Sequence, residues 1–252
     1  MMEISHVNVL IERKQILTDI SMEIPKGSFT CIIGKNGSGK STLLKAINQY
    51  LAYSGTIEVD QQDLKILNKD ARARLMCYLP QQRSIPNMNV RQLISHGRYP
   101  HLGFSKTLQD EDTYIIMEAA KLAGVESLME RNLQSLSGGE RQRAYIAMMI
   151  AQDTSYILLD EPTTFLDVEF QLDIMELLKQ LNERGKTIVM VAHDLPQAFS
   201  YASNIILIDH GRLIIQATPE EMIATDEVYA CFGVHVRTSK NPNDLYRYTF
   251  ER

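Results

Sequence analysis

The fold of this chain is decided by the stretch Gly34-Lys35-Asn36-Gly37-Ser38-Gly39-Lys40-Ser41, and Thr42 follows it directly. It has the spacing G-x-x-x-x-G-K-[ST] and lies between an apolar run, residues 29–33, and a helical stretch, residues 41–50. In that setting, backbone N–H groups and the positive end of the helix bind phosphate oxygens. We expect Lys40 to reach the β- and γ-phosphates of a nucleoside triphosphate and Ser41 to ligate Mg²⁺. The alternative is a glycine-rich turn without a ligand.

Polar side chains stand at the ends of two later apolar runs. Residues 156–160 predict a buried parallel strand that ends in Asp160 and Glu161, and such strand ends bind ligands in open α/β sheets. We expect Asp160 to hold Mg²⁺, and Glu161 to orient and deprotonate the water that attacks the γ-phosphate. Residues 187–192 end at His193, which we expect to contact the γ-phosphate. The alternatives are an acidic strand-to-loop junction and a structural histidine.

A helix is predicted to begin at Ser137, because Ser137 and Glu140 have the S-x-x-E spacing of a capping box. An apolar face with helical period follows it, formed by Ala144, Ala147, Met148 and Ala151. Gly138 and Gly139 leave the first N–H groups of this helix bare, which predicts a second anion site. An ordinary capped helix is the alternative. The nearby Arg141 and Arg143 are predicted to form a solvated helix face.

A further string, Leu79-Pro80-Gln81, lies between the phosphate loop and this helix. Along the chain, the phosphate loop is followed by Leu79-Pro80-Gln81, the helix start at Ser137, the acidic pair Asp160-Glu161 and His193. Motifs of these kinds in this order resemble those of the nucleotide-binding subunits of ABC transporters, and the resemblance covers residues 3–234. The resemblance implies an α/β fold: a P-loop NTPase core with a mixed, mainly parallel sheet, an N-terminal antiparallel β subdomain and an inserted helical subdomain. The core would comprise residues 1–82 and 142–234, and the helical subdomain residues 83–141. Residues 235–252 form a C-terminal tail whose role the sequence does not indicate, with a polar loop predicted over residues 238–244.

The resemblance also implies roles for single residues. Two copies would form a head-to-tail dimer, with Asp167 lining the interface. Ser137, Gly138 and Gly139 of one copy would close over the ATP that Lys40 of the other copy holds. Gln81 would touch Mg²⁺ and report the γ-phosphate to the membrane partner, with Gln82 as the second choice.

Two positions depart from the pattern of this family. An aromatic residue about two dozen positions before the phosphate loop usually stacks on adenine, and Ile11 stands there. Ile11 can pack against the base without stacking, which predicts a weaker preference for adenine. Phe165 stands where a small residue is common.

Composition limits the class of protein. A chain of 252 residues, 44 % of them hydrophobic, can build a substantial core. Its net charge of −5 and the lack of a dense basic run argue against nucleic acid as the main partner. Its apolar runs are far shorter than the roughly 20 residues that span a bilayer, and no signal peptide is evident, so membrane subunits would be separate chains. The three cysteines, Cys31, Cys77 and Cys231, are predicted to be reduced core residues.

The expected function is that of a peripheral ATPase on the cytoplasmic face of the cell membrane, bound to two permease subunits and indirectly to a substrate-binding lipoprotein. Residues 97–103, Gly-Arg-Tyr-Pro-His-Leu-Gly, resemble a stretch of importers of iron–siderophore complexes, haem and cobalamin. This resemblance implies an iron–siderophore cargo first, with haem or cobalamin behind it. A helix end with a proline turn is the alternative. An exporter subunit shares every catalytic string. A soluble cassette protein that acts on DNA or ribosomes is disfavoured. Members of the family that act on DNA structure insert a long coiled coil before the signature helix, whereas residues 82–136 lack heptads. Members that act on ribosomes usually carry two cassettes, and this sequence has one.

Overall fold

The computed structural model describes residues 1–103, 107–240 and 246–252. Contacts divide the chain into two compact units. The first comprises Met1–Leu67 and Thr187–Arg252, and the second comprises Asn68–Lys186. These packing units do not decide the boundaries of the core and of the helical subdomain that the sequence suggests.

The N-terminal part of the first unit is an antiparallel sheet with the order β2-β1-β4-β5. Its strands are β1 (Met2–Ile11), β2 (Lys14–Ile24), β4 (Ser54–Val59) and β5 (Gln62–Asp63). Apolar residues of β1 such as Ile4, Val7 and Val9 are buried, while neighbouring positions such as Ser5 are exposed. This partial alternation is typical of a sheet with one face on the core.

The same unit contains a group of parallel strands. Strand β3 (Phe29–Ile33) pairs in parallel with β8 (Thr187–Val191) and with β9 (Asn204–Asp209), and β10 (Arg212–Ala217) pairs antiparallel with β9. All residues of β3 and β8 are buried, as expected for strands covered on both faces. Helix α1 (Lys40–Ile47) is shorter than the predicted helical stretch, since Gln49 adopts a left-handed conformation with φ of 58°.

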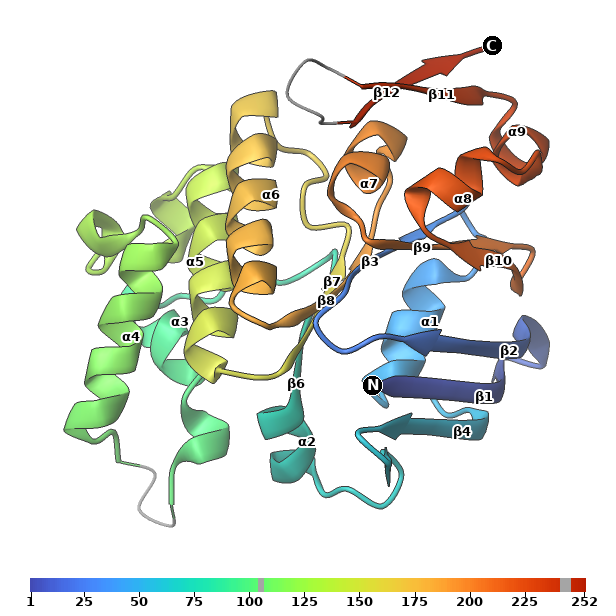
Figure 1. Cartoon of the computed structure of the whole chain (residues 1–252). Helices are drawn as coiled ribbons and strands as arrows, with labels where there is room; N and C mark the ends of the chain where they lie inside the picture. The colour runs from blue at the N-terminus through green and yellow to red at the C-terminus, as the bar shows by residue number, and fades with distance from the viewer. Residues whose placement is uncertain (104–106, 241–245) are drawn as a thin grey trace. The chain divides into compact units, whose positions relative to one another are not determined.

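The C-terminal tail forms a hairpin of β11 (His235–Lys240) and β12 (Tyr246–Glu251), which lies against α7 (Leu195–Tyr201) (Figure 1). The ring of Phe199 in α7 lies 5.5 Å from that of Tyr248 and 5.7 Å from that of Phe250. The predicted polar loop over residues 238–244 is therefore wrong for residues 238–240, which extend β11, and residues 241–244 lie outside the described residues. Two short helices, α8 (Pro219–Ile223) and α9 (Glu227–Phe232), precede the hairpin.

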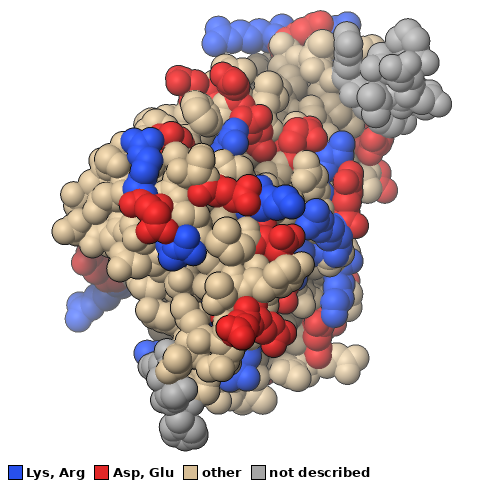
Figure 2. Space-filling view, turned by 90° about the vertical axis from the view of Figure 1, so that its left-hand side faces the viewer, with Lys and Arg blue, Asp and Glu red and all other residues tan. Residues whose placement is uncertain are grey.

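The second unit is mainly helical. Its strands β6 (Met76–Leu79) and β7 (Tyr156–Asp160) are parallel, and α2 (Lys69–Leu75) precedes β6. Helix α5 (Gly138–Gln152) packs on both α3 (Val90–His96) and α4 (Asp110–Leu122), as Figure 1 shows, and α6 (Val168–Glu183) follows β7. Among the helices of residues 1–103, 107–240 and 246–252, none combines the length and the apolar character needed to cross a bilayer. The face in Figure 2 carries acidic and basic side chains interspersed.

The segment after α3 is fixed to the end of α5. A Cβ at Gly97 would lie 2.3 Å from the backbone oxygen of Met148. Arg98 is 7 % exposed, and its guanidinium group donates from Nε to Asp112 Oδ1 at 2.9 Å and from Nη1 to the backbone oxygen of Ala151 at 2.9 Å. Tyr99, by contrast, is 53 % exposed. The first two residues of this segment therefore serve packing inside the second unit.

Candidate nucleotide-binding site

The phosphate loop connects β3 to α1 in the first unit. Gly34, Gly37 and Gly39 have positive φ angles of 151°, 78° and 106°. A Cβ at Gly34 would lie 2.1 Å from the backbone oxygen of Ile208, and one at Gly39 would lie 2.6 Å from Leu17 Cδ2. No other residue fits at position 34 without a shift of the backbone, so the glycine there is required by close approach to β9.

The ammonium group of Lys40 lies inside this loop. Lys40 is 5 % exposed, and Nζ donates to the backbone oxygens of Gly34 at 2.7 Å and Lys35 at 2.9 Å. The hydroxyl oxygen of Ser38 is also buried and has no hydrogen-bond partner among the described residues. A buried cation and a buried hydroxyl at the start of a helix form a donor set that fits phosphate oxygens.

Ile11 lies at the tip of the β1–β2 hairpin. The turn residues Glu12 and Arg13 have φ angles of 49° and 67°, as in a two-residue type I′ turn. Strand β2 also carries Leu17, whose side chain lies beside Gly39. The hairpin therefore borders the phosphate loop, and its tip offers an aliphatic group that is 37 % exposed.

His193 follows β8 and is exposed. The backbone N–H of Ala192 donates to the oxygen of Ile32 at 3.0 Å, which ties the end of β8 to the strand that leads into the phosphate loop. The neighbouring Asp194 caps α7, since its Oδ1 accepts from the backbone N–H of Gln197 at 2.8 Å. His193 thus stands on a fixed strand end.

In the second unit, two acidic residues lie where β7 ends. Asp160 is 3 % exposed, and its Oδ2 accepts a hydrogen bond from the hydroxyl of Tyr78 at 3.3 Å. Glu161 Oε2 accepts from Gln81 Nε2 at 2.6 Å and from Thr164 Oγ1 at 3.0 Å. Because β6 and β7 are parallel, the residues that follow them meet at one edge. The structure therefore brings together Gln81 and Glu161.

The predicted capping box at the start of α5 is confirmed. Ser137 N donates to Glu140 Oε2 at 2.8 Å, and Ser137 Oγ accepts from Glu140 N at 3.2 Å. Hydrogen bonds that the backbone N–H and the hydroxyl of Ser137 donate to the carboxylate hold the pKa of Glu140 below its usual value. A Cβ at Gly139 would lie 2.3 Å from the ring of Phe170 in α6. Gly139 is therefore needed for helix packing as well, a reason that the local sequence did not indicate.

Phe165 and Asp167, two residues that the family resemblance singled out, lie exposed in the loop between β7 and α6. Phe165 is 95 % exposed and has a φ of 64°. Asp167 precedes α6 and is exposed, and its side chain makes no capping hydrogen bond to that helix. A carboxylate and an aromatic ring are thus presented on the surface of the second unit.

The prediction of a solvated helix face at Arg141 and Arg143 is wrong. Both residues are half-buried. Arg141 Nη1 donates to the backbone oxygen of Leu136 at 3.2 Å, and Arg143 forms an ion pair with Asp173. Helix α5 is covered on more sides than its apolar stripe indicates, because neighbouring side chains bring their own polar partners.

Three residues near the site were missed by the sequence analysis. The guanidinium group of Arg83 donates to Gln142 Oε1 and lies 4.1 Å from the ring centre of Tyr145. Gln142 Nε2 in turn donates to the backbone oxygen of Pro162, next to Glu161, at 2.7 Å. Burial lowers the pKa of the Arg83 guanidinium, and the charge of Arg141 lowers it further. The sequence offered one indication of these residues, namely that Gln142 lies one turn into the helix that begins at the predicted capping box.

The predicted core positions of the three cysteines are confirmed. Cys31, Cys77 and Cys231 are free and buried. Burial raises the pKa of the Cys77 thiol to about 12, so it stays protonated at neutral pH.

Comparisons with known proteins match the chain to a family and to several relatives. The model of the ABC transporter family matches residues 17–164. The chain is 41 % identical over 230 residues to the petrobactin import ATP-binding protein FpuD of Bacillus anthracis, covering 90 % of this chain and 84 % of the relative. It is 37 % identical to the ferric enterobactin transport ATP-binding protein FepC of Escherichia coli, covering 90 % and 85 %.

Solved structures confirm the predicted α/β fold class. An ABC transporter in an inward-facing conformation, described as being of the metal-chelate type, superposes with a TM-score of 0.84 at 25 % identity, covering all of this chain and 97 % of the other. A dimeric ATP-binding cassette bound to ADP and Pi superposes with a TM-score of 0.76 at 28 % identity, covering 87 % and 99 %.

Proposed function

Because the chain belongs to the ABC transporter family, as one of its ATP-binding subunits, we propose that it hydrolyses ATP to drive the import of an iron–siderophore complex. Relatives that cover 90 % of the chain at 37–41 % identity act in petrobactin import and ferric enterobactin transport. The catalytic part of the proposal rests above all on one observation, the hydrogen bond between Gln81 and Glu161 beyond the ends of β6 and β7.

ATP binds through the phosphate loop that defines this family. Lys40 would lie against the β- and γ-phosphates, and the backbone of Gly34–Ser41 and Thr42 would supply N–H groups. Mg²⁺ would be held by oxygen atoms of Ser41, Gln81 and Asp160, and these oxygen donors suit that hard cation. When bound, Mg²⁺ would neutralise charge on the phosphate oxygens.

Glu161 is the proposed general base. Its carboxylate is oriented by hydrogen bonds from Gln81 and Thr164, so it can align an attacking water and take its proton. Gln81 donates to Glu161 through Nε2, so its amide oxygen is the atom that would ligate Mg²⁺, and Gln81 would report the γ-phosphate to the membrane partner. His193, on the fixed end of β8, would contact the γ-phosphate.

ABC cassettes dimerise, and a solved relative of this chain is a dimer. We expect a head-to-tail pair of this chain, in which the start of α5 of one copy closes over the ATP of the other through Ser137, Gly138 and Gly139. The capped N-terminus of a 15-residue helix provides the N–H groups and the dipole for this contact. The exposed Asp167 would line the interface.

Recognition of adenine would depend on Ile11. Its position at the tip of a hairpin that borders the phosphate loop supports contact with the base. An aliphatic side chain gives apolar contact without aromatic stacking, so we expect weak discrimination between adenine and other bases.

The cassettes of this family associate with permease subunits of membrane transporters. We expect two permease subunits and, indirectly, a substrate-binding lipoprotein, with this chain on the cytoplasmic face of the membrane and no nucleic acid as partner. A cobalamin import ATP-binding protein of Halobacterium salinarum is 33 % identical over 96 % of this chain and 61 % of that protein. Cobalamin or haem is therefore the second cargo candidate, and an exporter is the third.

The variant Glu161→Gln tests the catalytic assignment. It should bind ATP, form a stable dimer in ATP and lose roughly 10²–10⁴-fold in turnover, the usual contribution of a general base. Binding and dimerisation are measured by nucleotide titration and size-exclusion chromatography, and turnover by phosphate release. Glu183→Gln, at an exposed position at the end of α6, is the control and should retain full activity. Hydrolysis at the wild-type rate by Glu161→Gln would refute the assignment.

The partners can be identified with the same variant. A tagged Glu161→Gln chain, incubated with native membranes and Mg-ATP, should recover a polytopic permease and a substrate-binding lipoprotein by mass spectrometry. Binding of iron–siderophore complexes, haem or cobalamin to that lipoprotein would then decide the cargo. Recovery of ribosomal or other soluble proteins alone would contradict the transport function and leave the ATPase chemistry intact.

A further inference from the structure

A small cavity of the second unit lies beside the proposed catalytic loop. Its volume is about 220 Å³, and it is bordered by the segment after β6, the start of α5 and the loop before α6. Arg83, Arg141, Gln142, Tyr145, Gly138 and Thr164 are among the residues that line it. All of its lining residues are described, and none of them is Asp or Glu. The lining therefore has two cations and no anion, and the carboxylate of Glu161 is already bonded to two lining residues, Gln81 and Thr164.

Arg83 is held rigidly at this cavity. Its Nη2 donates to Gln142 Oε1, and its guanidinium plane lies over Tyr145. Gln142 is itself fixed by its hydrogen bond to the backbone oxygen of Pro162. Arg83 Nη1 is buried and has no acceptor among the described residues. A buried cationic donor without an acceptor is unfavourable, so this N–H group favours an acceptor from outside the unit.

Arg141 adds a second guanidinium group to the same cavity. Its Nη1 is bonded to the backbone oxygen of Leu136, and a guanidinium group has five N–H donors, so others remain for a ligand. The cavity also reaches Gly138 in the first turn of α5, where the helix dipole is positive. Arg83 and Arg141 line the same cavity, so an anion bound between them would offset the repulsion of their charges.

We propose that this cavity is a binding site for one oxyanion, held by Arg83 and Arg141. Guanidinium groups bind carboxylates and phosphates through paired N–H donors. Pockets for drug-sized ligands have volumes of about 300–1,000 Å³, so the smaller cavity suits a single phosphate or carboxylate group. Free inorganic phosphate and an acidic side chain of a partner protein are the two sources of that group.

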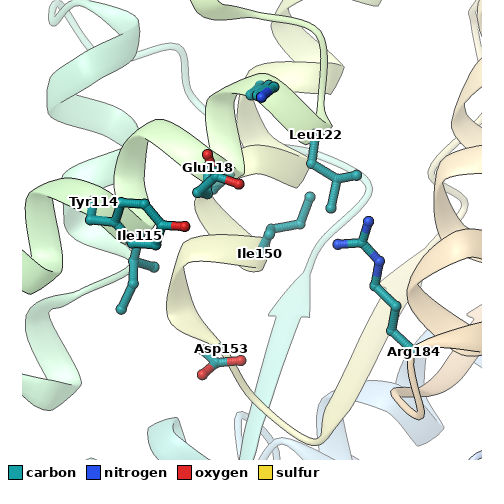
Figure 3. Close-up of a pocket in the computed structure, with 9 residues that line it drawn as sticks. Tyr114, Ile115, Glu118, Leu122, Ile150, Asp153 and Arg184 are labelled. Carbon is teal, nitrogen blue, oxygen red and sulfur yellow. The ribbon is translucent and has the colours of Figure 1, made fainter.

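A larger pocket of the same unit shows the contrast. It has a volume of about 520 Å³ and lies between α4 and the ends of α5 and α6 (Figure 3). Its basic residues Lys121 and Arg184 are accompanied by Glu118 and Asp153, so it carries its own anions. Its mixed charges do not single out a ligand, and Arg184 therefore provides a matched control.

Free phosphate is tested on the isolated full chain. Arginine side-chain N–H signals are recorded by ¹⁵N NMR during a titration with inorganic phosphate, and R83Q and R141Q assign the signals, which separates this cavity from the phosphate loop. Saturable shifts of Arg83 and Arg141 are expected, with at least a tenfold weaker apparent affinity at Arg141 in R83Q and an unchanged affinity in R184Q. R83K keeps the positive charge but lacks the paired N–H donors of a guanidinium group, so it should weaken binding to an intermediate degree. Circular dichroism verifies that each variant is folded.

Binding of an acidic side chain of a partner protein is tested in the complex with the permease. This experiment rests on the proposed function. R83E should reduce recovery of the complex at least tenfold, and one acidic-to-lysine substitution in a cytoplasmic permease segment should restore it. Success of the titration assigns free phosphate, and success of the charge exchange assigns the partner side chain. Failure of both arms overturns the proposal. ATP hydrolysis by the wild-type chain, measured in the same preparations, tests the proposed function separately.

Discussion

Replacing Asp112 by Asn should lower the stability of the chain, because it removes the negative charge of a buried ion pair. Asp112 and Arg98 are each 7 % exposed, and the pair is joined at 2.9 Å. The second carboxylate oxygen accepts from Gln109 N at 3.0 Å, at the start of α4. Removal of one partner of a buried pair costs about 3–5 kcal/mol. Since Asn keeps the shape and one acceptor, we expect about 2–3 kcal/mol, or a decrease in Tm of about 4–12 °C for a chain of this size.

Differential scanning calorimetry of the apo chain provides the measurement. Glu111→Gln is the matched control, because Glu111 lies one residue earlier in the same first turn of α4 and is exposed. Its Tm should change by no more than about 4 °C, since exposed charges contribute about 0–1 kcal/mol. If Asp112→Asn unfolds within 1 °C of the wild type, Arg98 has an adequate alternative partner and the reasoning from burial is wrong.

The same pair predicts a dependence of stability on pH. The backbone N–H of Gln109 and the guanidinium group of Arg98 hold the pKa of Asp112 below its usual value of about 4. Its contribution is therefore fully present above that usual value and is lost as the pH falls through the lower folded-state pKa. The difference in Tm between wild type and Asp112→Asn should shrink as the pH falls below about 4. A constant difference across this range would contradict the assignment.

Three further substitutions test separate parts of the site. Lys40→Ala should abolish ATP binding in a fluorescence titration while leaving the circular dichroism spectrum unchanged, and retained affinity would contradict its assignment. Gly139→Ala should cost about 1–3 kcal/mol in urea unfolding, because the added methyl group meets the ring of Phe170, whereas a Cβ at Gly138 has ordinary contact at 3.7 Å. Equal effects of alanine at the two glycines would refute the packing argument. Ile11→Tyr should raise the affinity for ATP relative to GTP, and an unchanged ratio would remove Ile11 from the base site.

Features that depend on neighbouring residues could be predicted from the sequence. The phosphate loop is an example, because its glycine spacing and the strand and helix around it lie within about 20 residues. The start of α5 is another, because the S-x-x-E spacing of Ser137 and Glu140 lies within one helical turn. The hairpin tail was not predicted, since it is stabilised by contact of Tyr248 and Phe250 with Phe199, far away in the chain.

Partners distant in sequence account for the remaining misses at the site. Arg83 and Gln142 are 59 positions apart, and Gln81 and Glu161 are 80 apart. Local periodicity assigns a residue to a face of its own helix, but it does not indicate which side chain arrives from elsewhere. Arg141 shows the consequence, since a charge predicted to be solvated is half-buried and lines a cavity together with Arg83, which is also half-buried.

The segment 97–103 illustrates how such partners affect an inference about cargo. Its similarity to importers of iron–siderophore complexes, haem and cobalamin indicated the cargo, yet Gly97 is fixed by close approach to Met148, and Arg98 is fixed by its buried pair with Asp112. These two identities are explained by packing within the second unit, whatever the cargo is. Tyr99, by contrast, is exposed and is not explained by this packing. The assignment of an iron–siderophore cargo therefore rests on identity over 90 % of the chain, and this segment adds little to it.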